Sequence, residues 1–153
     1  MKNRAFLLLG LFGCAHHTNH EPEQPLFPAL ANVRAVYIDH LGNEVSSAMV
    51  REKLRTRLAH GGRFVVVELP TKADAILSGA AGVNQEVVGG PNGVWTRYSG
   101  WAAVRMVSTV SGDTVWFYEY QPPRRTPKSA SSHVADQIAK TAVKDALKAE
   151  SPQ

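Results

Sequence analysis

The single cysteine of the chain stands at position 14, directly after a short apolar run. Lys2 and Arg4 precede that run, AFLLLGLF at residues 5–12, and this order is typical of a bacterial export signal. The run is too short to span a bilayer, which takes about 20 apolar residues. Because one cysteine cannot form an intrachain disulfide, the exported domain has to be held together by its apolar core.

The end of the run, Leu11-Phe12-Gly13-Cys14, resembles the lipobox of bacterial lipoproteins. The resemblance implies a leader at 1–13 that is cleaved before Cys14, a diacylglyceryl group on the thiol and an acyl chain such as palmitate on the new amino terminus. Several acyl chains, at about 0.8 kcal/mol per buried CH₂, make an essentially permanent anchor. Ala15, where an Asp would favour the inner membrane, implies the outer membrane, facing the periplasm. The alternative is an incidental cysteine in a peptide that is cut elsewhere or retained.

The charge balance does not point to a nucleic-acid partner. The whole chain has 17 Lys and Arg against 13 Asp and Glu. Removal of residues 1–13 takes away Lys2 and Arg4 and no acids, which leaves 15 against 13. A net charge this close to zero does not predict nucleic-acid binding.

Residues 14–32 are expected to form the lipidated cysteine and a flexible tether. His16, His17 and His20 have a spacing that sometimes binds a metal. The favoured alternative is a polar linker with chance histidines, so no metal site is predicted. Leu26, Phe27 and Leu30 are expected to pack locally on the domain or against the bilayer.

The body of the chain begins with a strand pattern at residues 33–38 (VRAVYI). Ser46 or Ser47 can cap the helix that follows. The apolar residues Val50, Leu54 and Leu58 of this helix recur every four residues, and Met49 widens the apolar stripe. Gly61 is expected to end the helix in the left-handed conformation. Residues 63–69 are almost continuously apolar and predict a second strand that is buried on both faces.

Three further strands are predicted. The first begins near Ala75, and its small residues at 78–82 indicate close approach by a packed helix. GGPNG at 89–93 breaks this run. Residues 94–110 predict a long strand that forms a hairpin with residues 114–120. The 94–110 strand carries Trp101, Ala103, Arg105 and Val107 on one face and Ala102, Val104, Met106 and Val110 on the other.

A last helix is expected to start near Ser132. Its two apolar rows contain Val134, Ile138, Ala142 and Ala146, and Ala139, Val143 and Leu147; its water-facing side contains Lys140, Lys144, Asp145 and Lys148. The order strand, helix, four strands, helix predicts one α+β domain at 33–149 and a tail at 150–153. We expect a single mixed sheet of about five strands with two helices packed on one face, in which the first strand–helix–strand unit pairs in parallel.

Several phrases of this domain occur together in one group of proteins. They are LRTRLAHGGRFVVVEL (54–69) with its Gly62-Arg63-Phe64 turn, KADAILSGAAGV (72–83) with Ala73-Asp74 and Gly79, and SGDTVWFYEY (111–120) with Ser111-Gly112-Asp113 and Trp116. With the Ala-rich last helix, they resemble the periplasmic lipoprotein domains related to the curli secretion channel subunit CsgG, the amino-terminal domain of TolB and the LpoB-like activators of penicillin-binding proteins. The resemblance spans about 33–149 and implies a fold more than a function. The segment 83–100 is too short and polar for the membrane-spanning hairpin of a secretion channel.

The sequence predicts no catalytic, cofactor-binding or metal-binding residues. Asp39 and His40 are adjacent at a strand end, where side chains point to opposite faces and do not naturally pair. Asp74 is expected to hydrogen-bond local backbone rather than act as an acid. The glycine-rich segment 89–93 lacks the Lys-Ser/Thr of a P-loop.

Two groups of residues are candidates for a partner surface. One is the aromatic and arginine cluster Trp95, Arg97, Tyr98 and Trp101, and the other is basic, with Arg51 and Arg55 in the first helix and Arg124 and Arg125 in the proline-rich loop. Aromatic residues and arginine are enriched at protein interfaces, and cations also attract anionic lipids. The alternatives are an aromatic-rich sheet core and a solvated helix face.

These features support three functional hypotheses. The first is a membrane-anchored, non-catalytic envelope lipoprotein that binds and supports or regulates a protein complex. The second is a subunit of an oligomeric, curli-type secretion or transport assembly, so that the chain itself is a partner. The third is an envelope enzyme or small-ligand binder, which would need an apolar pocket with converging polar groups.

Lipidation gives the first testable prediction. In protein made by its native host, mass spectrometry should find acyl groups on Cys14 and no residues before it. The Cys14→Ala variant should move from the membrane fraction to the soluble fraction, because a chain without acyl groups has no anchor. Ala15→Ser serves as the control and should stay in the membrane fraction. An unmodified sulfur at Cys14 would contradict the prediction.

Overall fold

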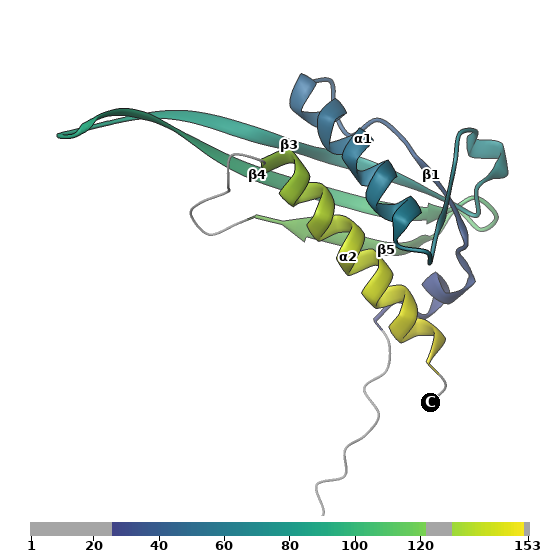
Figure 1. Cartoon of the computed structure of the whole chain (residues 1–153). Helices are drawn as coiled ribbons and strands as arrows, with labels where there is room; N and C mark the ends of the chain where they lie inside the picture. The colour runs from purple at the N-terminus through teal and green to yellow at the C-terminus, as the bar shows by residue number, and fades with distance from the viewer. Residues whose placement is uncertain (1–25, 122–129, 152–153) are drawn as a thin grey trace, which may run out of the picture.

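A computed structural model describes residues 26–121 and 130–151 (Figure 1). Cys14, the three tether histidines and the loop cations Arg124 and Arg125 lie outside these ranges, so the expectations for them stay predictions. The described residues form the α+β fold that the sequence predicts, with one mixed sheet and two helices in the expected order.

The elements follow each other without a long interruption. They are η1 (Pro28–Asn32), β1 (Ala35–Ile38), α1 (Val45–His60), β2 (Val65–Val67), η2 (Pro70–Lys72), β3 (Ala75–Gly90), β4 (Gly93–Ser108), β5 (Thr114–Tyr120) and α2 (Ala130–Glu150). The sheet order is β2-β1-β3-β4-β5; β1 is parallel to β2 and β3, and the other pairs are antiparallel. Helices α1 and α2 lie on the same face of this sheet (Figure 1).

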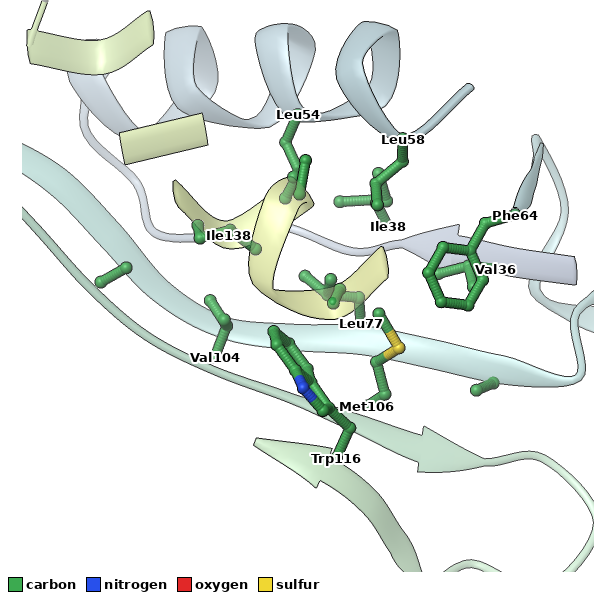
Figure 2. Packing of buried hydrophobic residues seen from close by; sticks show 14 of the residues in the cluster. Val36, Ile38, Leu54, Leu58, Phe64, Leu77, Val104, Met106, Trp116 and Ile138 are labelled. Atoms are coloured by element: carbon green, nitrogen blue, oxygen red, sulfur yellow. The ribbon is translucent and has the colours of Figure 1, made fainter. Parts of the chain in front are cut away.

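The core lies between the two helices and the sheet face that they cover (Figure 2). Its largest fully buried side chains include Val50, Leu54 and Leu58 of α1, Val36 and Ile38 of β1, Leu77 of β3, Met106 of β4, Trp116 of β5 and Val134 and Ile138 of α2. In β1, β3 and β4 these residues alternate with less buried neighbours, and the helix residues recur every three or four positions, as each period requires. Removing this apolar surface from water, at about 25 cal/mol per Å², is what stabilises a chain without a disulfide.

Trp116 shows how a polar group is accommodated in this core. Its side chain is completely buried, and its Nε1–H donates to the carboxylate of Asp145 on α2 at 3.0 Å. The sequence placed Asp145 on the water-facing side of the last helix, and this is wrong in one respect: its carboxylate is turned toward the core to accept the indole N–H. A buried indole N–H without a partner would be costly, so this bond fixes β5 against α2.

The N-terminal turn η1 is part of the folded body. Leu30 is fully buried, while Leu26 is exposed, so the packing expected for residues 26–30 occurs at Leu30 and at the partly buried Phe27. The buried guanidinium of Arg63 donates to the carbonyls of Val33 (2.6 Å), Ala31 (3.2 Å) and Leu30 (3.3 Å).

The same guanidinium is paired with Glu150 at the end of α2, at 2.9 Å, and Arg34 pairs with that carboxylate at 2.8 Å. Burial lowers the pKa of Arg63, and the charge of Glu150 opposes that shift. We call this arrangement of Arg63, Glu150 and the η1 carbonyls the Arg63 clamp. It joins the beginning and the end of the domain.

Three local predictions in the first half are wrong. β2 is not buried on both faces: it is an edge strand, and Val65 is 64% exposed because only β1 lies beside it and only one face is covered. Gly61 is right-handed, with φ of −67°, and Gly62 takes the left-handed conformation at +69°. Glu44, without a side-chain capping bond, precedes α1 in place of Ser46 or Ser47.

Strands β3 and β4 form one long hairpin. The predicted break at GGPNG is the turn of this hairpin. Gly90 and Gly93 pair on either side of it. At its other end β4 stops at Ser108, and Val110 lies in the following turn with 94% of its surface exposed, so the prediction that it shares a strand face with Met106 is wrong.

The small residues of β3 have two different neighbours. Gly82 lies against Ser46 of α1, as the prediction of helix approach requires. Gly79 instead lies against β4: it has φ of +136°, and a Cβ there would be 2.2 Å from the carbonyl oxygen of Ala103. Neither the backbone angle nor the space admits a side chain.

A pair of glycine substitutions tests this. Gly79→Ala should lower the free energy of unfolding by about 3 kcal/mol or more, because strain at positive φ adds to the overlap with β4. Gly89→Ala, in the same strand with nothing within 4 Å of the new Cβ, should change it by less than about 1 kcal/mol. Urea unfolding followed by circular dichroism measures both, and equal effects would contradict the account.

Candidate interaction surfaces

The sheet has one face that no described helix covers. By the alternation of the strands, its outward side chains include Tyr37, Val65, Val67, Ile76, Ala80, Trp101, Ala103, Arg105, Val107 and Phe117. We call this surface the open face. Most of its side chains are apolar. Phe117 is 60% exposed, although its ring forms a T-shaped pair with that of Phe27, with 5.3 Å between the ring centroids. An antiparallel sheet with one solvated face usually carries polar residues there, so an apolar open face indicates an interaction surface.

A second surface is the far end of the β3–β4 hairpin. Near its base the hairpin is held by the body, where Ser46 Oγ accepts from the Val83 N–H at 3.4 Å. Residues 86–97, which we call the arm, project past the N-terminal ends of both helices (Figure 1). Five residue pairs at about 3.4 Å each give the arm a length of about 17 Å.

The arm carries apolar side chains into solvent. Val87 is 66% exposed, Val94 76% and Trp95 48%. Trp95 lies over Gly90, where a Cβ would meet its ring at 2.8 Å, and Glu86 and Arg97 form a cross-strand ion pair at 3.5 Å. A two-stranded ribbon is marginally stable by itself in water, so these contacts leave the arm in need of further support.

The structure divides the predicted aromatic cluster between two faces. Trp95, Arg97 and Trp101 lie on the side continuous with the open face. Tyr98 pairs with Gln85 on the opposite side, where both line a cavity of about 290 Å³ with the first residues of α1 and α2. The cluster is therefore not one patch, because strand alternation separates Arg97 from Tyr98.

The predicted basic surface of α1 is largely engaged within the domain. Arg51 donates through Nε and Nη2 to the carbonyl of Ile38 (3.1 and 3.0 Å) and through Nε to that of Asp39 (3.1 Å), so it closes the end of β1. Arg55 is paired with Glu68, and their hydrogen bond lowers the pKa of Glu68 and raises that of Arg55.

The next two cations of α1 reach α2. Arg57 pairs with Asp136 at 2.6 Å, and Lys53 donates to the Ser132 hydroxyl at 2.7 Å. Contacts of this kind hold the two helices together, and each cation that makes them is less available to a partner.

The candidate chemistry of the β1 end has a local explanation. The Asp39 carboxylate accepts from the backbone N–H of His40 at 2.8 Å. Within residues 26–121 and 130–151, no three His, Cys, Asp or Glu side chains gather where they could hold a metal ion. In the same ranges no helix is both long and apolar enough to cross a bilayer.

Asp74 binds backbone, as predicted, but that of a distant strand. One carboxylate oxygen accepts from the N–H groups of Ala35 (2.7 Å) and Arg34 (2.9 Å), and the Asp74 N–H donates to the Ala35 carbonyl at 2.8 Å. These hydrogen bonds lower the pKa of Asp74, the one from Ala35 most strongly. Asp74 therefore aligns the starts of β1 and β3, which is a structural role.

No known protein-family model matches the chain, and no curated protein matches its sequence. In fold, the chain is similar to PelC. Over 77% of this chain and 88% of the other, a dodecamer of a PelC point variant from Paraburkholderia phytofirmans aligns with a TM-score of 0.54 and 19% identity. A second PelC dodecamer from Paraburkholderia phytofirmans covers 78% and 89% with a TM-score of 0.52 and 15% identity. At this identity the likeness shows the fold alone.

Asp74 provides a pH-dependent prediction. Asp74→Asn should lower the free energy of unfolding at pH 7 by about 1 kcal/mol, since hydrogen bonds to a charged acceptor are the stronger ones and solvent screens this exposed group. The folded-state pKa is depressed, so the stabilisation is present above the unfolded value of about 3.9 and is lost as the pH falls through the folded pKa.

The difference between wild type and Asp74→Asn should therefore shrink as the pH is lowered below about 4, in urea titrations at several pH values. Asp113→Asn, at an exposed acid in the β4–β5 turn, is the matched control and should show little difference at any pH. A difference between wild type and Asp74→Asn that does not change with pH would contradict the assignment.

Proposed function

We propose that the chain is a lipid-anchored, non-catalytic subunit of a homo-oligomeric assembly in the bacterial cell envelope. The observation that carries the proposal is the arm, which holds exposed apolar side chains beyond the reach of its own domain. The anchor is the acylated Cys14 that the lipobox resemblance implies, with the domain on the periplasmic side of the outer membrane. The assembly belongs to the class of secretion or transport supports expected from the resemblance to the curli channel subunit.

Contact with a partner would stabilise the arm, which is only a two-stranded ribbon. Val87 and Val94 keep most of their surface exposed and Trp95 about half, and the ribbon beyond Gln85 pairs only with itself. Burying these side chains against another surface would stabilise both the ribbon and the complex, at about 25 cal/mol per Å² of apolar area. Tryptophan and arginine, here Trp95 and Arg97, are frequent energetic centres of such interfaces.

The open face of a second copy fits this requirement. It is apolar across several strands, it contains the exposed Phe117, and Arg105 and Glu119 add charges that fix a register. The arm and the open face are different parts of one chain, so the contact is head-to-tail. Head-to-tail contacts close into rings when the rotation allows it, and the PelC structures of similar fold are dodecamers.

The alternative is a monomeric accessory lipoprotein that uses the arm to bind another envelope protein. The position of the arm favours it: the arm lies at the end of the domain opposite to η1, where the chain from the anchor arrives (Figure 1). The two functions differ in mass, since the first requires a stable assembly of the purified chain and the second a monomer or dimer.

Substitutions in the arm test the proposal. The wild-type, acylated protein in mild detergent should sediment as a homo-oligomer in analytical ultracentrifugation. Val94→Ser with Trp95→Ser should reduce it to smaller species with an unchanged circular dichroism spectrum, since the arm makes few contacts with its own body. Val110→Ser, at the 94% exposed residue of the β4–β5 turn, is the control and should leave the oligomer intact. A monomeric wild-type protein would contradict the proposal.

A further inference from the structure

A groove of about 840 Å³ runs between the end of α1 and the second half of α2. Its apolar floor is formed by Ala139, Val143 and Leu147 of α2. At the end of α1 the two helices are in close contact, because a Cβ on Gly61 would be 3.2 Å from Val143. Because α1 ends at His60, it does not cover the last turns of α2, and Leu147 is 53% exposed there.

The rim of the groove is cationic. Lys140, Lys144 and Lys148 follow one another at intervals of four residues and therefore lie in one row of α2. From α1, Arg57 and His60 line the opposite side. The acid in the lining, Asp136, is paired with Arg57 at 2.6 Å, so its charge is already balanced and the lining as a whole is positive.

An apolar floor beneath a row of ammonium groups matches an anionic amphiphile. Lys140 and Lys144 can bind phosphate oxygens, and the floor can take the first part of an acyl chain. We infer that this groove binds the headgroup and upper acyl chain of an anionic phospholipid in the membrane that anchors the chain. The inference rests on the lipid anchor of the proposed function and adds a second contact with the same membrane.

The route of the chain places the groove near that membrane. Ser151, at the end of the groove, directly follows Glu150 of the Arg63 clamp, which holds η1. Figure 1 shows η1 and the C-terminal end of α2 at the same end of the domain, away from the arm. From Leu26, the first described residue, to Cys14 is a span of 12 residues, which reach at most about 40 Å. In an anchored domain, the groove can therefore contact the lipid surface.

The experiment uses the mature chain, residues 14–153, with Cys14→Ala so that no acyl group contributes. Co-sedimentation compares vesicles of phosphatidylcholine with vesicles that also contain phosphatidylglycerol. Wild type should bind only the anionic vesicles, and Lys140→Gln with Lys144→Gln should lower the partition coefficient about tenfold or more. Leu147→Ser should lower it several-fold and leave its salt dependence unchanged, because this exposed side chain contributes apolar contact and no charge.

Lys72→Glu changes the net charge by the same two units at an exposed position elsewhere and is the matched control. It should retain most of the binding. An equal loss in this control and in the double lysine variant would mean that overall charge attracts the vesicles, and absence of wild-type binding would mean that the groove takes another occupant, such as an acidic segment of a protein; either result overturns the inference. Sedimentation of each variant without vesicles reports its oligomeric state, so a failure of the assembly is recognised separately.

Discussion

The covering of one sheet face by two helices is the constraint on which the other features depend. Val50, Leu54 and Leu58 of α1 and Val134 and Ile138 of α2 are the largest fully buried side chains that these helices contribute to the core, and the strands supply the facing layer. With a single cysteine in the chain, no crosslink assists this burial. The helices end before the hairpin does and occupy only one side of the sheet, so the same packing that stabilises the domain leaves the open face and the arm without a cover.

The periodicity of the sequence predicted the elements well. The shared face of Ala102, Val104 and Met106 and the four-residue spacing of Val50, Leu54 and Leu58 follow from how strands and helices present one face to a core. The same pattern cannot tell whether a strand has one neighbour or two. Residues 65–67 are apolar enough for a central strand, yet β2 lies at the edge, because β3 pairs with the other side of β1.

Contacts between distant residues were beyond the reach of sequence reasoning. Arg63 was expected in a turn and at the start of a strand, although its guanidinium binds carbonyls 30 and more residues earlier and a carboxylate near the end of the chain. Asp145 reads as a solvated helix residue until β5 places an indole N–H beside it. The candidate partner residues were recognised by type, but strand alternation separates Tyr98 from Trp95, and α1 uses Arg51 and Arg55 for its own contacts. The groove of α2 had a visible signal, the lysines at 140, 144 and 148, which was assigned to a wet helix face.

The Arg63 clamp has a mechanical consequence under the proposed lipid anchor at Cys14. Tension arriving through Phe27 and η1 meets the guanidinium of Arg63 before it meets any strand. Since Glu150 binds the same guanidinium, the load passes directly into α2 and is spread along the helix axis rather than shearing β1 out of the sheet. Tension on the N-terminal segment of such a domain would therefore leave the pairing register of the sheet unchanged.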